Sequence, residues 1–373
     1  MPEILFASVH PRGRVPSQRF RFEQYVDFLA EHGFRTQFSS VLHPDEYGIV
    51  YGPGREGRKA VIVGRSLLRR VGDLARASSF DIVVVQREVI PLGTALFESA
   101  FRRAGARLVF DFDDAIWLPN ASEANRGLAR LKRPGKTSTI ISLADMVFAG
   151  NAYLREYARQ FSPRVKLVPT TIDTELYRER AAPVDRERIC VGWSGSITSI
   201  QYFRLVIPVL RRLRQRFGDR VYFKVIGDPD FRSKDLDIQG IPWNPATEID
   251  DLRELDIGIM PLPDDEWAKG KCGLKGLQYM ALGTPTVMSP VGVNTEIIDD
   301  GRNGFLAASA DDWFARLSQL VESPSLRQEL GRAGRERVVE SYSVNSQRWR
   351  YLEYLDRVLQ DSPVTWRRER RST

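Results

Sequence analysis

The sequence predicts an α/β protein made of two Rossmann-like domains, each built on a parallel β-sheet. Short apolar runs typical of buried strands alternate with amphipathic helical stretches along the chain. The alternation stops at a charged, aperiodic stretch, YRERAAPVDRER at 177–188, and then starts again. A chain of 373 residues is also longer than one core usually supports. We therefore expect domains at 1–176 and 189–344, joined by a linker at 177–188 and facing each other across a ligand-binding cleft.

In the first domain we expect each strand to be followed by a helix. The predicted strands are 4–9, 35–40, 81–85, 107–112, 145–148 and 165–168, and the clearest helices are 16–32, 92–104 and the one capped by Asn151. The second domain repeats this order with strands at 189–193, 221–226, 257–260, 286–288 and 305–307. Three helices, 311–322, 325–342 and 345–360, end the chain.

The composition narrows the class of protein. No apolar run reaches the roughly 18 residues that a membrane-spanning helix needs, and the N-terminus lacks the features of a signal peptide. Two cysteines, Cys190 and Cys272, are too few for a disulfide framework or a thiolate metal site, so we expect a cytoplasmic protein. The net charge of +7 favours anionic partners, but no nucleic-acid-binding motif accompanies it. The basic tail at 366–371 is either a solvated end or a peripheral contact with the anionic inner face of a membrane.

The stretch 269–287, KGKCGLKGLQYMALGTPTV, carries the main candidate site. Its centre has helical periodicity, and Lys271, Lys275 and Gln278 are spaced to share one helix face. Gly273 lies at the helix entry, where free backbone N–H groups favour an anion and a missing side chain allows close approach. The two lysines therefore either bind an anionic ligand or form an ordinary solvated face.

Polar residues in the first domain form a second candidate site. The strand at 107–112 runs into Asp113 and Asp114, and ligands of open α/β sheets bind at the carboxyl ends of strands. These carboxylates are expected to bind hydroxyl groups, although turn formation explains them equally well. Arg19 and Arg21, in the first turn of the helix at 16–32, are interpreted as anion-binding or solvent-exposed.

A G-x-G-x-x-G sequence at 52–57 does not indicate a nicotinamide-dependent dehydrogenase. A dinucleotide fingerprint directly follows the first strand and opens a helix, whereas this one lies in a long polar loop.

The second half of the chain resembles the donor-binding domain of family 4 glycosyltransferases, which are retaining enzymes of GT-B fold. The motifs that carry the resemblance are GLKGLQYMALGTPTVMSPVGVNTEII at 273–298 and DGRNGFL at 300–306. Weaker similarity extends back to LDIGIMP at 255–261 and VPTTID at 168–173.

The resemblance implies transfer of a sugar from a nucleotide-diphosphate sugar to an acceptor hydroxyl with retention of configuration. The acceptor is a glycan, a lipid-linked compound or a small molecule, and cell-envelope polysaccharide synthesis is a plausible setting. The resemblance also implies that the segment 345–373 contains a helix that crosses back onto the first domain. No cofactor and no metal are expected if lysines neutralise the diphosphate.

Four positions depart from the family pattern. Gly270 and Gln278 occupy the places of two glutamates, and Ser196 and Gln201 occupy those of an arginine and a lysine that hold the diphosphate. One branch of the family has a Lys-x-x-x-Lys-x-x-Glu/Gln-Tyr-Met-Ala pattern, as here. Its lysines are interpreted as replacements for the two missing cations.

These considerations give three sets of predicted site residues. The catalytic set is Lys271, Lys275, Asp113 and Asp114; the donor-binding set is Gly195, Ser196, Thr198, Gly273, Leu274 and Gln278; the acceptor-side set is Arg19 and Arg21. Two alternatives remain open. One is a sugar-nucleotide-binding protein without turnover, suggested by the absent carboxylate at Gly270, and the other is a nucleotide-sugar epimerase of the same fold.

Overall fold

The computed structural model describes residues 1–50, 52, 54–91, 93–118, 135–179 and 187–361. The chain divides into two compact units, Met1–Pro169 with Arg348–Thr373, and Thr170–Gln347. The sequence analysis placed these limits at 176 and 344/345. The basic stretch at 366–371 and most of the expected linker lie outside the described residues.

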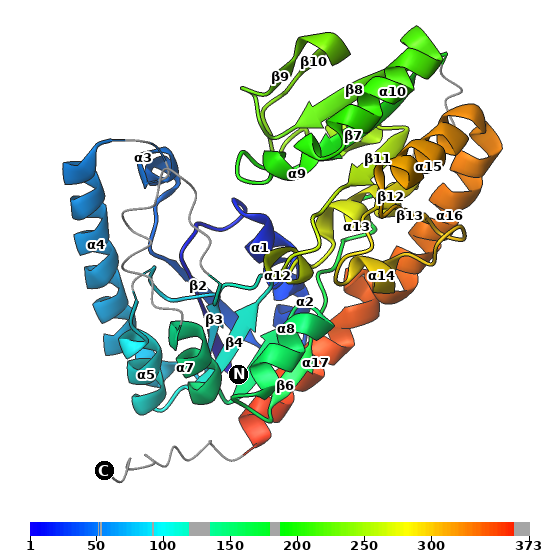
Figure 1. Ribbon diagram of the computed structural model, residues 1–373. Coiled ribbons are helices and arrows are strands. Elements are labelled where there is room, and N and C mark those ends of the chain that lie inside the picture. The colour runs from blue at the N-terminus through cyan, green and yellow to red at the C-terminus, as the bar shows by residue number, and fades with distance from the viewer. Residues whose placement is uncertain (51, 53, 92, 119–134, 180–186, 362–373) are drawn as a thin grey trace, which may run out of the picture. The chain divides into compact units, whose positions relative to one another are not determined.

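The first unit contains a six-stranded sheet in the order β2-β1-β3-β4-β5-β6, with every neighbouring pair parallel (Figure 1). Its strands are β1 Glu3–Ser8, β2 Arg35–Ser40, β3 Ile82–Gln86, β4 Arg107–Phe112, β5 Met146–Ala149 and β6 Val165–Leu167. Its α-helices are α1 Pro16–Arg19, α2 Val26–Glu31, α3 Tyr47–Val50, α4 Glu56–Ala75, α5 Leu96–Arg103, α7 Gly135–Leu143 and α8 Ala152–Arg159. Asn151 caps α8 as predicted, since its side chain accepts a hydrogen bond from the backbone N–H of Leu154.

Two helical predictions in this unit were wrong. The expected helix at 16–32 is interrupted between α1 and α2, because three consecutive residues, 20–22, are all buried and cannot share one face of a regular helix. No helix was predicted after the G-x-G-x-x-G sequence at 52–57, which was placed in a long polar loop; in the structure its last two residues begin α4, a helix of 20 residues. The apolar periodicity of α4 escaped detection because three of its four buried residues are polar.

The last helix, α17 (Val344–Gln360), returns to the first unit, as the resemblance implied. Its Tyr351 ring stacks on Tyr25 with centroids 4.5 Å apart and also meets Phe148. Trp349 packs edge-on against Phe28. Aromatic contacts therefore hold the end of the chain against helices and strands of the first 169 residues.

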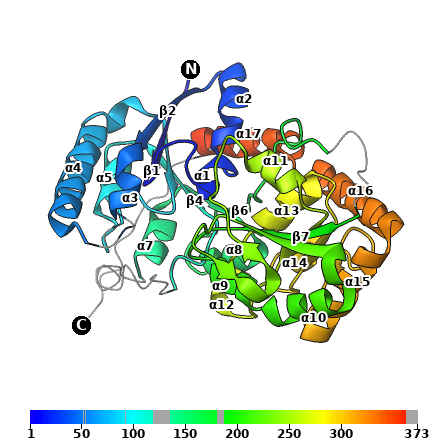
Figure 2. The ribbon, with the colours of Figure 1, turned by 90° about the horizontal axis from the view of Figure 1, so that it is seen from above.

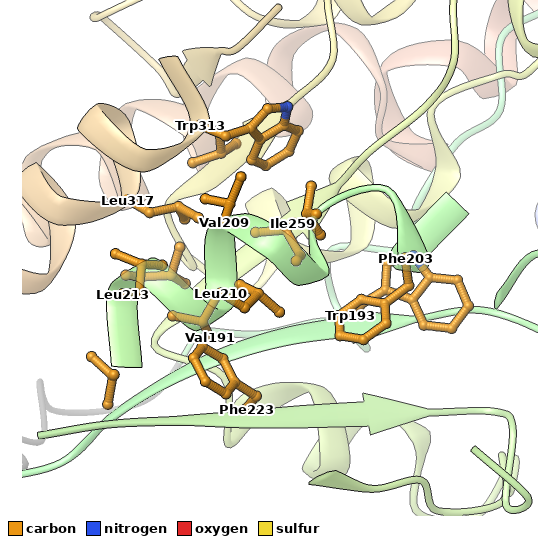
Figure 3. Close-up of a cluster of buried hydrophobic side chains, with 14 of the residues drawn as sticks. Val191, Trp193, Phe203, Val209, Leu210, Leu213, Phe223, Ile259, Trp313 and Leu317 are labelled. Atoms are coloured by element: carbon orange, nitrogen blue, oxygen red, sulfur yellow. The ribbon is translucent and has the colours of Figure 1, made fainter. Parts of the chain in front are cut away.

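The second unit contains a five-stranded parallel sheet in the order β13-β12-β11-β7-β8, with a separate hairpin of β9 and β10 (Figure 1). Figure 2 shows the helices of this unit from above. The strands are β7 Ile189–Ser194, β8 Val221–Ile226, β9 Arg232–Ser233, β10 Ile238–Gln239, β11 Ile257–Met260, β12 Thr286–Met288 and β13 Phe305–Leu306. The α-helices are α9 Ile200–Arg204, α10 Ile207–Phe217, α11 Glu248–Arg253, α12 Glu266–Lys269, α13 Leu274–Ala281, α14 Asn294–Ile297, α15 Ala310–Glu322 and α16 Pro324–Ser341. Figure 3 shows the hydrophobic core of this unit. Val191 and Phe223, from two strands, and Trp313, from a helix, belong to one cluster of buried side chains.

The strand orders locate the ligand-binding edge of each sheet. In the first unit β2 is added on one side of β1 and the later strands on the other, so the strand order switches between β1 and β3. In the second unit the order switches in the same way between β7 and β11. Open α/β sheets bind ligands beyond the carboxyl ends of the strands at such switch points. Within the described residues, no helix is long and apolar enough to span a membrane.

Candidate functional site

The loop that follows β7 gathers three of the predicted donor-binding residues. The Gly195 backbone N–H donates to the Ile226 carbonyl at 2.9 Å, which fixes the start of the loop to β8. The hydroxyls of Ser196 and Thr198 are 2.9 Å apart, and the Ser196 N–H donates to the Ser199 hydroxyl at 2.9 Å. The loop thus places several hydroxyl groups at the carboxyl end of β7.

Two glycines allow this loop to pass close to the neighbouring strand. Gly227 follows β8 with a φ of +109°, and a Cβ built there would lie 2.0 Å from the Gly195 carbonyl oxygen. A Cβ on Gly195 would lie 2.2 Å from the Trp193 ring. Neither position can therefore carry a side chain without displacing the loop.

Helix α13 is fixed to the end of β7 by Tyr279. The buried Tyr279 hydroxyl accepts a hydrogen bond from the Ser194 backbone N–H at 2.7 Å. Its ring covers Gly258 of β11, where a Cβ would lie 2.4 Å from the ring. Burial raises the pKa of Tyr279, so the hydroxyl stays protonated. The sequence analysis assigned no role to this tyrosine.

The N-terminus of α13 lies at Gly273, whose φ is +73°. A Cβ on Gly273 would lie 2.3 Å from Cδ1 of Ile297, so glycine is required there for two reasons. The helix begins only at Leu274, and no side chain caps it. Lys271 therefore precedes the helix, and the predicted single helix face of Lys271, Lys275 and Gln278 was wrong for Lys271, because a left-handed residue interrupts it.

Each of the two lysines lies against a tryptophan ring. The Lys275 ammonium is 5.7 Å from the ring centroid of Trp193, the residue that precedes the Ser194–Ser199 loop. The Lys271 ammonium is 5.1 Å from the ring centroid of Trp267 in α12. Both distances suit a cation–π contact, which attracts the ammonium to the ring. Of the two, Lys275 is the one placed beside the loop after β7.

Gln278 belongs to a buried polar cluster. Its amide nitrogen donates to the Tyr177 hydroxyl at 3.1 Å and to Oε1 of Glu248 at 3.2 Å. Glu248 also accepts from Tyr177 at 3.0 Å and from the Trp243 indole at 2.9 Å. Gln278 is only 4% exposed, so its contacts are mainly internal. The sequence analysis counted Tyr177 as the first linker residue, although the structure packs it into the second unit.

The two predicted aspartates of the first unit are both bound to Arg87. The Arg87 guanidinium contacts Oδ1 of Asp113 at 2.7 Å and Oδ2 of Asp114 at 2.5 Å. Arg87 directly follows β3 and has a φ of +60°, which is rare for a residue with a side chain. Such local strain is often found at functional sites. The sequence analysis did not single out Arg87, and the positive φ of a residue other than glycine or asparagine gives little signal in a sequence.

His10 lies on the other side of the switch point, in the loop after β1. Its carbonyl accepts hydrogen bonds from the Ser8 hydroxyl at 3.0 Å and the Gln18 amide at 3.1 Å. Burial, together with the positive charge of Arg87, lowers the pKa of His10 to about 4. The imidazole is therefore neutral at pH 7, and it lies within electrostatic reach of the arginine that holds both aspartates.

The structure gives Arg21 and Arg19 different environments. Arg21 is buried, and its guanidinium binds the Asp111 carboxylate and the Val168 carbonyl. The expectation that Arg21 faces solvent or binds an anionic ligand was therefore wrong, because its guanidinium forms an internal ion pair. Arg19 lies over the ring of Phe20, 5.0 Å from its centroid. In the part of the chain that the structure describes, no three or more potential metal ligands group together.

Solved structures of similar proteins identify the fold. Sucrose-phosphate synthase from Thermosynechococcus elongatus superposes with a TM-score of 0.66 at 14% identity, covering 97% of this chain and 100% of that one. HepE of Anabaena in complex with UDP and glucose gives a TM-score of 0.65 at 15% identity, covering 95% and 99%. The two parallel-sheet, Rossmann-like domains thus have the GT-B fold predicted from the sequence.

The family match in sequence lies within the second unit. Residues 188–323 match the family described as "Glycosyl transferases group 1". A D-inositol 3-phosphate glycosyltransferase of Arthrobacter sp. is 36% identical over 194 residues, which are 45% of this chain and 44% of that protein. Another, from Kribbella flavida, is 25% identical over 194 residues, 46% of each chain. The chain therefore spans less than half the length of these curated relatives.

Proposed function

We propose that the protein is a retaining glycosyltransferase that moves a sugar from a nucleotide-diphosphate sugar to an acceptor hydroxyl. The match of residues 188–323 to the glycosyltransferase family carries this proposal. The donor would then bind in the second unit at the β7 switch point, between the loop after β7 and helix α13, which Tyr279 and Lys275 connect to the end of β7. A solved structure of the same fold holds UDP and glucose, which supports the choice of donor class.

The N-terminus of α13 is proposed to receive the diphosphate. Its first backbone N–H groups have no capping side chain, and Gly273 leaves space for an oxygen to approach them. The hydroxyls of Ser196 and Thr198 lie in the loop to which Tyr279 ties this helix. Bond breaking in the donor leaves negative charge on the diphosphate, which oriented N–H and hydroxyl groups stabilise.

Lys275 and Lys271 are proposed to supply the positive charge. Lys275 is the stronger candidate because its ammonium lies beside Trp193 at the entrance to the loop. Lys271 is proposed to approach the diphosphate from the segment before the helix, where its ammonium lies over the Trp267 ring. With two ammonium groups near the phosphates, the proposal requires no metal ion. Gln278 is proposed to contact the ribose through its carbonyl oxygen, since its amide nitrogen is engaged by Tyr177 and Glu248.

The acceptor hydroxyl is proposed to bind in the first unit near Asp113 and Asp114. Arg87 holds both carboxylates in fixed orientations, and each carboxylate oxygen has two lone pairs, so these groups can accept a hydrogen bond from the hydroxyl. The neutral His10 offers a second polar group on the same side of the sheet. We propose that the leaving phosphate helps to remove the acceptor proton, because no protein nucleophile is identified.

A second candidate is a protein that binds sugar nucleotides without turnover. The observation in its favour is Gly270, which ends α12 and has no carboxylate where the related enzymes carry a glutamate. The two functions differ in turnover and agree in donor binding.

A thermal-shift panel of nucleotide-diphosphate sugars tests the proposal. A donor present at a hundred times its Kd should raise the melting temperature by roughly 5–10 °C. Lys275→Ala should reduce this shift, and it should lower transition-state stabilisation by roughly 2–4 kcal/mol once an acceptor is found. Lys269→Ala is the matched control, because the Lys269 ammonium pairs with Glu266 at 3.1 Å.

The outcomes separate the candidates. A shift with a nucleotide sugar, followed by release of the nucleotide with an acceptor, supports the transferase. A shift without release under any acceptor condition favours the binding protein. The role of Lys275 would be contradicted if Lys275→Ala showed the same donor-induced shift in melting temperature as Lys269→Ala and the unchanged protein.

A further inference from the structure

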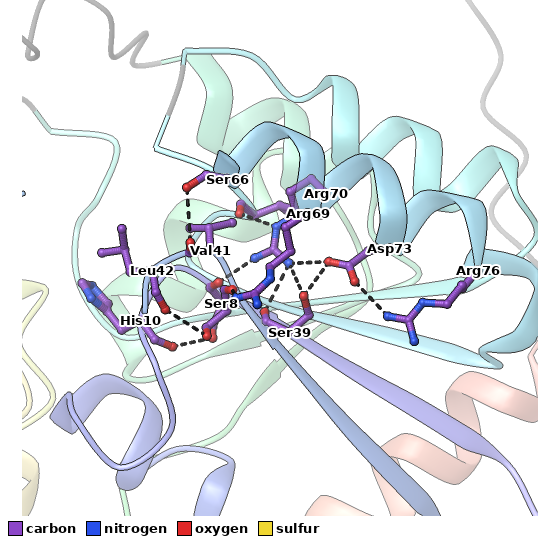
Figure 4. A network of polar contacts seen from close by, with 12 residues as sticks. Ser8, His10, Ser39, Val41, Leu42, Ser66, Arg69, Arg70, Asp73 and Arg76 are labelled. Atoms are coloured by element: carbon purple, nitrogen blue, oxygen red, sulfur yellow. Dashed lines mark hydrogen bonds and ion pairs between the residues drawn. The ribbon is translucent and has the colours of Figure 1, made fainter. Parts of the chain in front are cut away.

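Helix α4 has a polar buried face. Of its residues, Ile62, Ser66, Arg70 and Asp73 are buried. The Arg70 guanidinium donates to Asp73 at 2.8 Å, to the hydroxyl of Ser39 in β2 at 2.9 Å, and to backbone carbonyls (Figure 4). These contacts satisfy the buried charge, so the helix is held to the sheet by polar groups.

The opposite face of α4 is apolar and exposed. Val61 is 71% exposed, Leu68 is 73% exposed and Val71 is 56% exposed. Spacings of seven and three residues place these side chains in one stripe. Small residues complete the stripe: Gly57, Gly64, Gly72 and Ala75, all exposed. The stripe contains no charged residue, which is unusual for the solvent side of a surface helix.

Arginines follow one edge of this apolar stripe. Arg58, Arg65, Arg69 and Arg76 are all exposed and repeat at spacings of seven, four and seven residues. Between positions 55 and 76 the sequence has seven arginines or lysines and two acidic residues, of which Asp73 is buried. The outer side of α4 is therefore apolar along its centre and carries arginines along one edge, where Arg65 pairs with Glu46 and Arg76 pairs with Asp73.

A groove continues the basic edge toward the end of β2. It has a volume of about 680 Å³ and is lined by Arg69, Arg76, His43 and Ser40, among others. Two acidic groups belong to this region: Asp73 also lines the groove and pairs with Arg76 at 3.1 Å, and the exposed Asp45 contacts the His43 imidazole at 3.2 Å. The groove offers space for a phosphate-sized group beside the arginine edge.

We propose that the outer face of α4 docks on an anionic lipid bilayer. Val61, Leu68 and Val71 would enter the boundary of the acyl chains, and the arginine edge would meet lipid phosphates. A second copy of the chain fits this face poorly. Two such faces would bring arginines together, and the exposed acidic residue of the helix, Glu56, already pairs with Lys59 at 3.3 Å.

Flotation of the full chain with lipid vesicles tests this proposal without any assay of activity, so its result is independent of the glycosyltransferase proposal. The protein should bind vesicles that contain phosphatidylglycerol but not vesicles of phosphatidylcholine alone, and salt should weaken the binding. Leu68→Gln with Val71→Gln should lower the partition coefficient roughly tenfold. Arg58→Gln with Arg69→Gln should lower it by a similar factor.

Two controls separate α4 from other surfaces. Leu205→Gln and Val339→Gln change side chains that are 53% and 42% exposed in the second unit, and they should leave binding unchanged. A chain that ends at Asp361 lacks the basic tail and should still bind. The side chains replaced in the α4 variants are exposed, so these variants should still fold. Circular dichroism and the melting temperature check that they do.

Several results would overturn the proposal. Absence of binding to anionic vesicles is one, and unchanged binding by both α4 variants is another. Loss of binding in the shortened chain alone would assign the contact to the tail. A dimer that the α4 variants dissociate, in the absence of vesicle binding, would assign the apolar face to a second copy.

Discussion

Tyr279→Phe tests how α13, the helix of the proposed donor site, is fixed to the sheet. The substitution removes one hydroxyl oxygen and leaves the ring that covers Gly258 in place. In the unchanged protein this oxygen accepts the Ser194 backbone N–H at 2.7 Å in a fully buried environment. Without it, the N–H at the end of β7 stays buried and has lost this acceptor.

The expected loss of stability follows from that change. A buried polar group that loses its partner costs about 1–3 kcal/mol, and the unchanged ring volume adds no cavity term. In a unit of this size, each kcal/mol lowers the melting temperature by roughly 2–4 °C. We therefore expect a fall of about 2–12 °C in the transition of the second unit, read from near-ultraviolet circular dichroism.

The same variant should weaken nucleotide-sugar binding, because Ser194 leads directly into the loop with Ser196 and Thr198. Tyr354→Phe is the control, since this half-buried tyrosine lies in the first unit beside Phe148. It should change the stability of the second unit by less than about 0.5 kcal/mol. A Tyr279→Phe protein with unchanged melting temperature and unchanged donor binding would refute the reasoning.

Two further predictions concern the helix entry and the first unit. Gly273→Ala should destabilise the second unit by roughly 2–4 kcal/mol in urea unfolding, because it combines backbone strain with the contact to Ile297. Gly301→Ala has a similar φ of +80° with open space around it, so it should show the strain alone; equal costs would contradict the steric argument. The lowered pKa of His10 means that the unfolded chain binds its proton more tightly, so stability should fall as the pH decreases from about 6.5 to about 4, by up to roughly 3 kcal/mol. His10→Asn should remove that part of the pH dependence, which is measured as the free energy of unfolding at several pH values. If the variant kept the same pH dependence, His10 would not be its source.

The sequence predicted the sheet strands well because their apolar runs carry a strong local signal. Strand β4 was predicted with both ends correct, since Arg107–Phe112 is a continuous buried run followed by acidic residues. Helix α4 was missed because its inward residues are Ser66, Arg70 and Asp73, which do not follow the usual apolar pattern. The break between α1 and α2 was missed because one of the three consecutive buried residues is Arg21, whose partner Asp111 is 90 residues away in the sequence.

The candidate site could be predicted only where its residues are close in sequence. The helix at 274–281 and its glycine entry follow from local spacing. The contacts of Gln278 with Glu248 and of the aspartates with Arg87 join residues about 30 positions apart, and no local pattern indicates them. The roles of these residues in binding and catalysis stay predictions.

The position of Lys275 is determined by packing more than by charge. Lys275 and Tyr279 are four residues apart and therefore share a face of α13. Tyr279 ties that face to the end of β7 through Ser194, and Trp193, the preceding residue, then meets the Lys275 ammonium. The Trp193 ring attracts the ammonium and so fixes its place next to the carboxyl end of β7. A lysine at this place suits a ligand that brings negative charge to the switch point, as a diphosphate does.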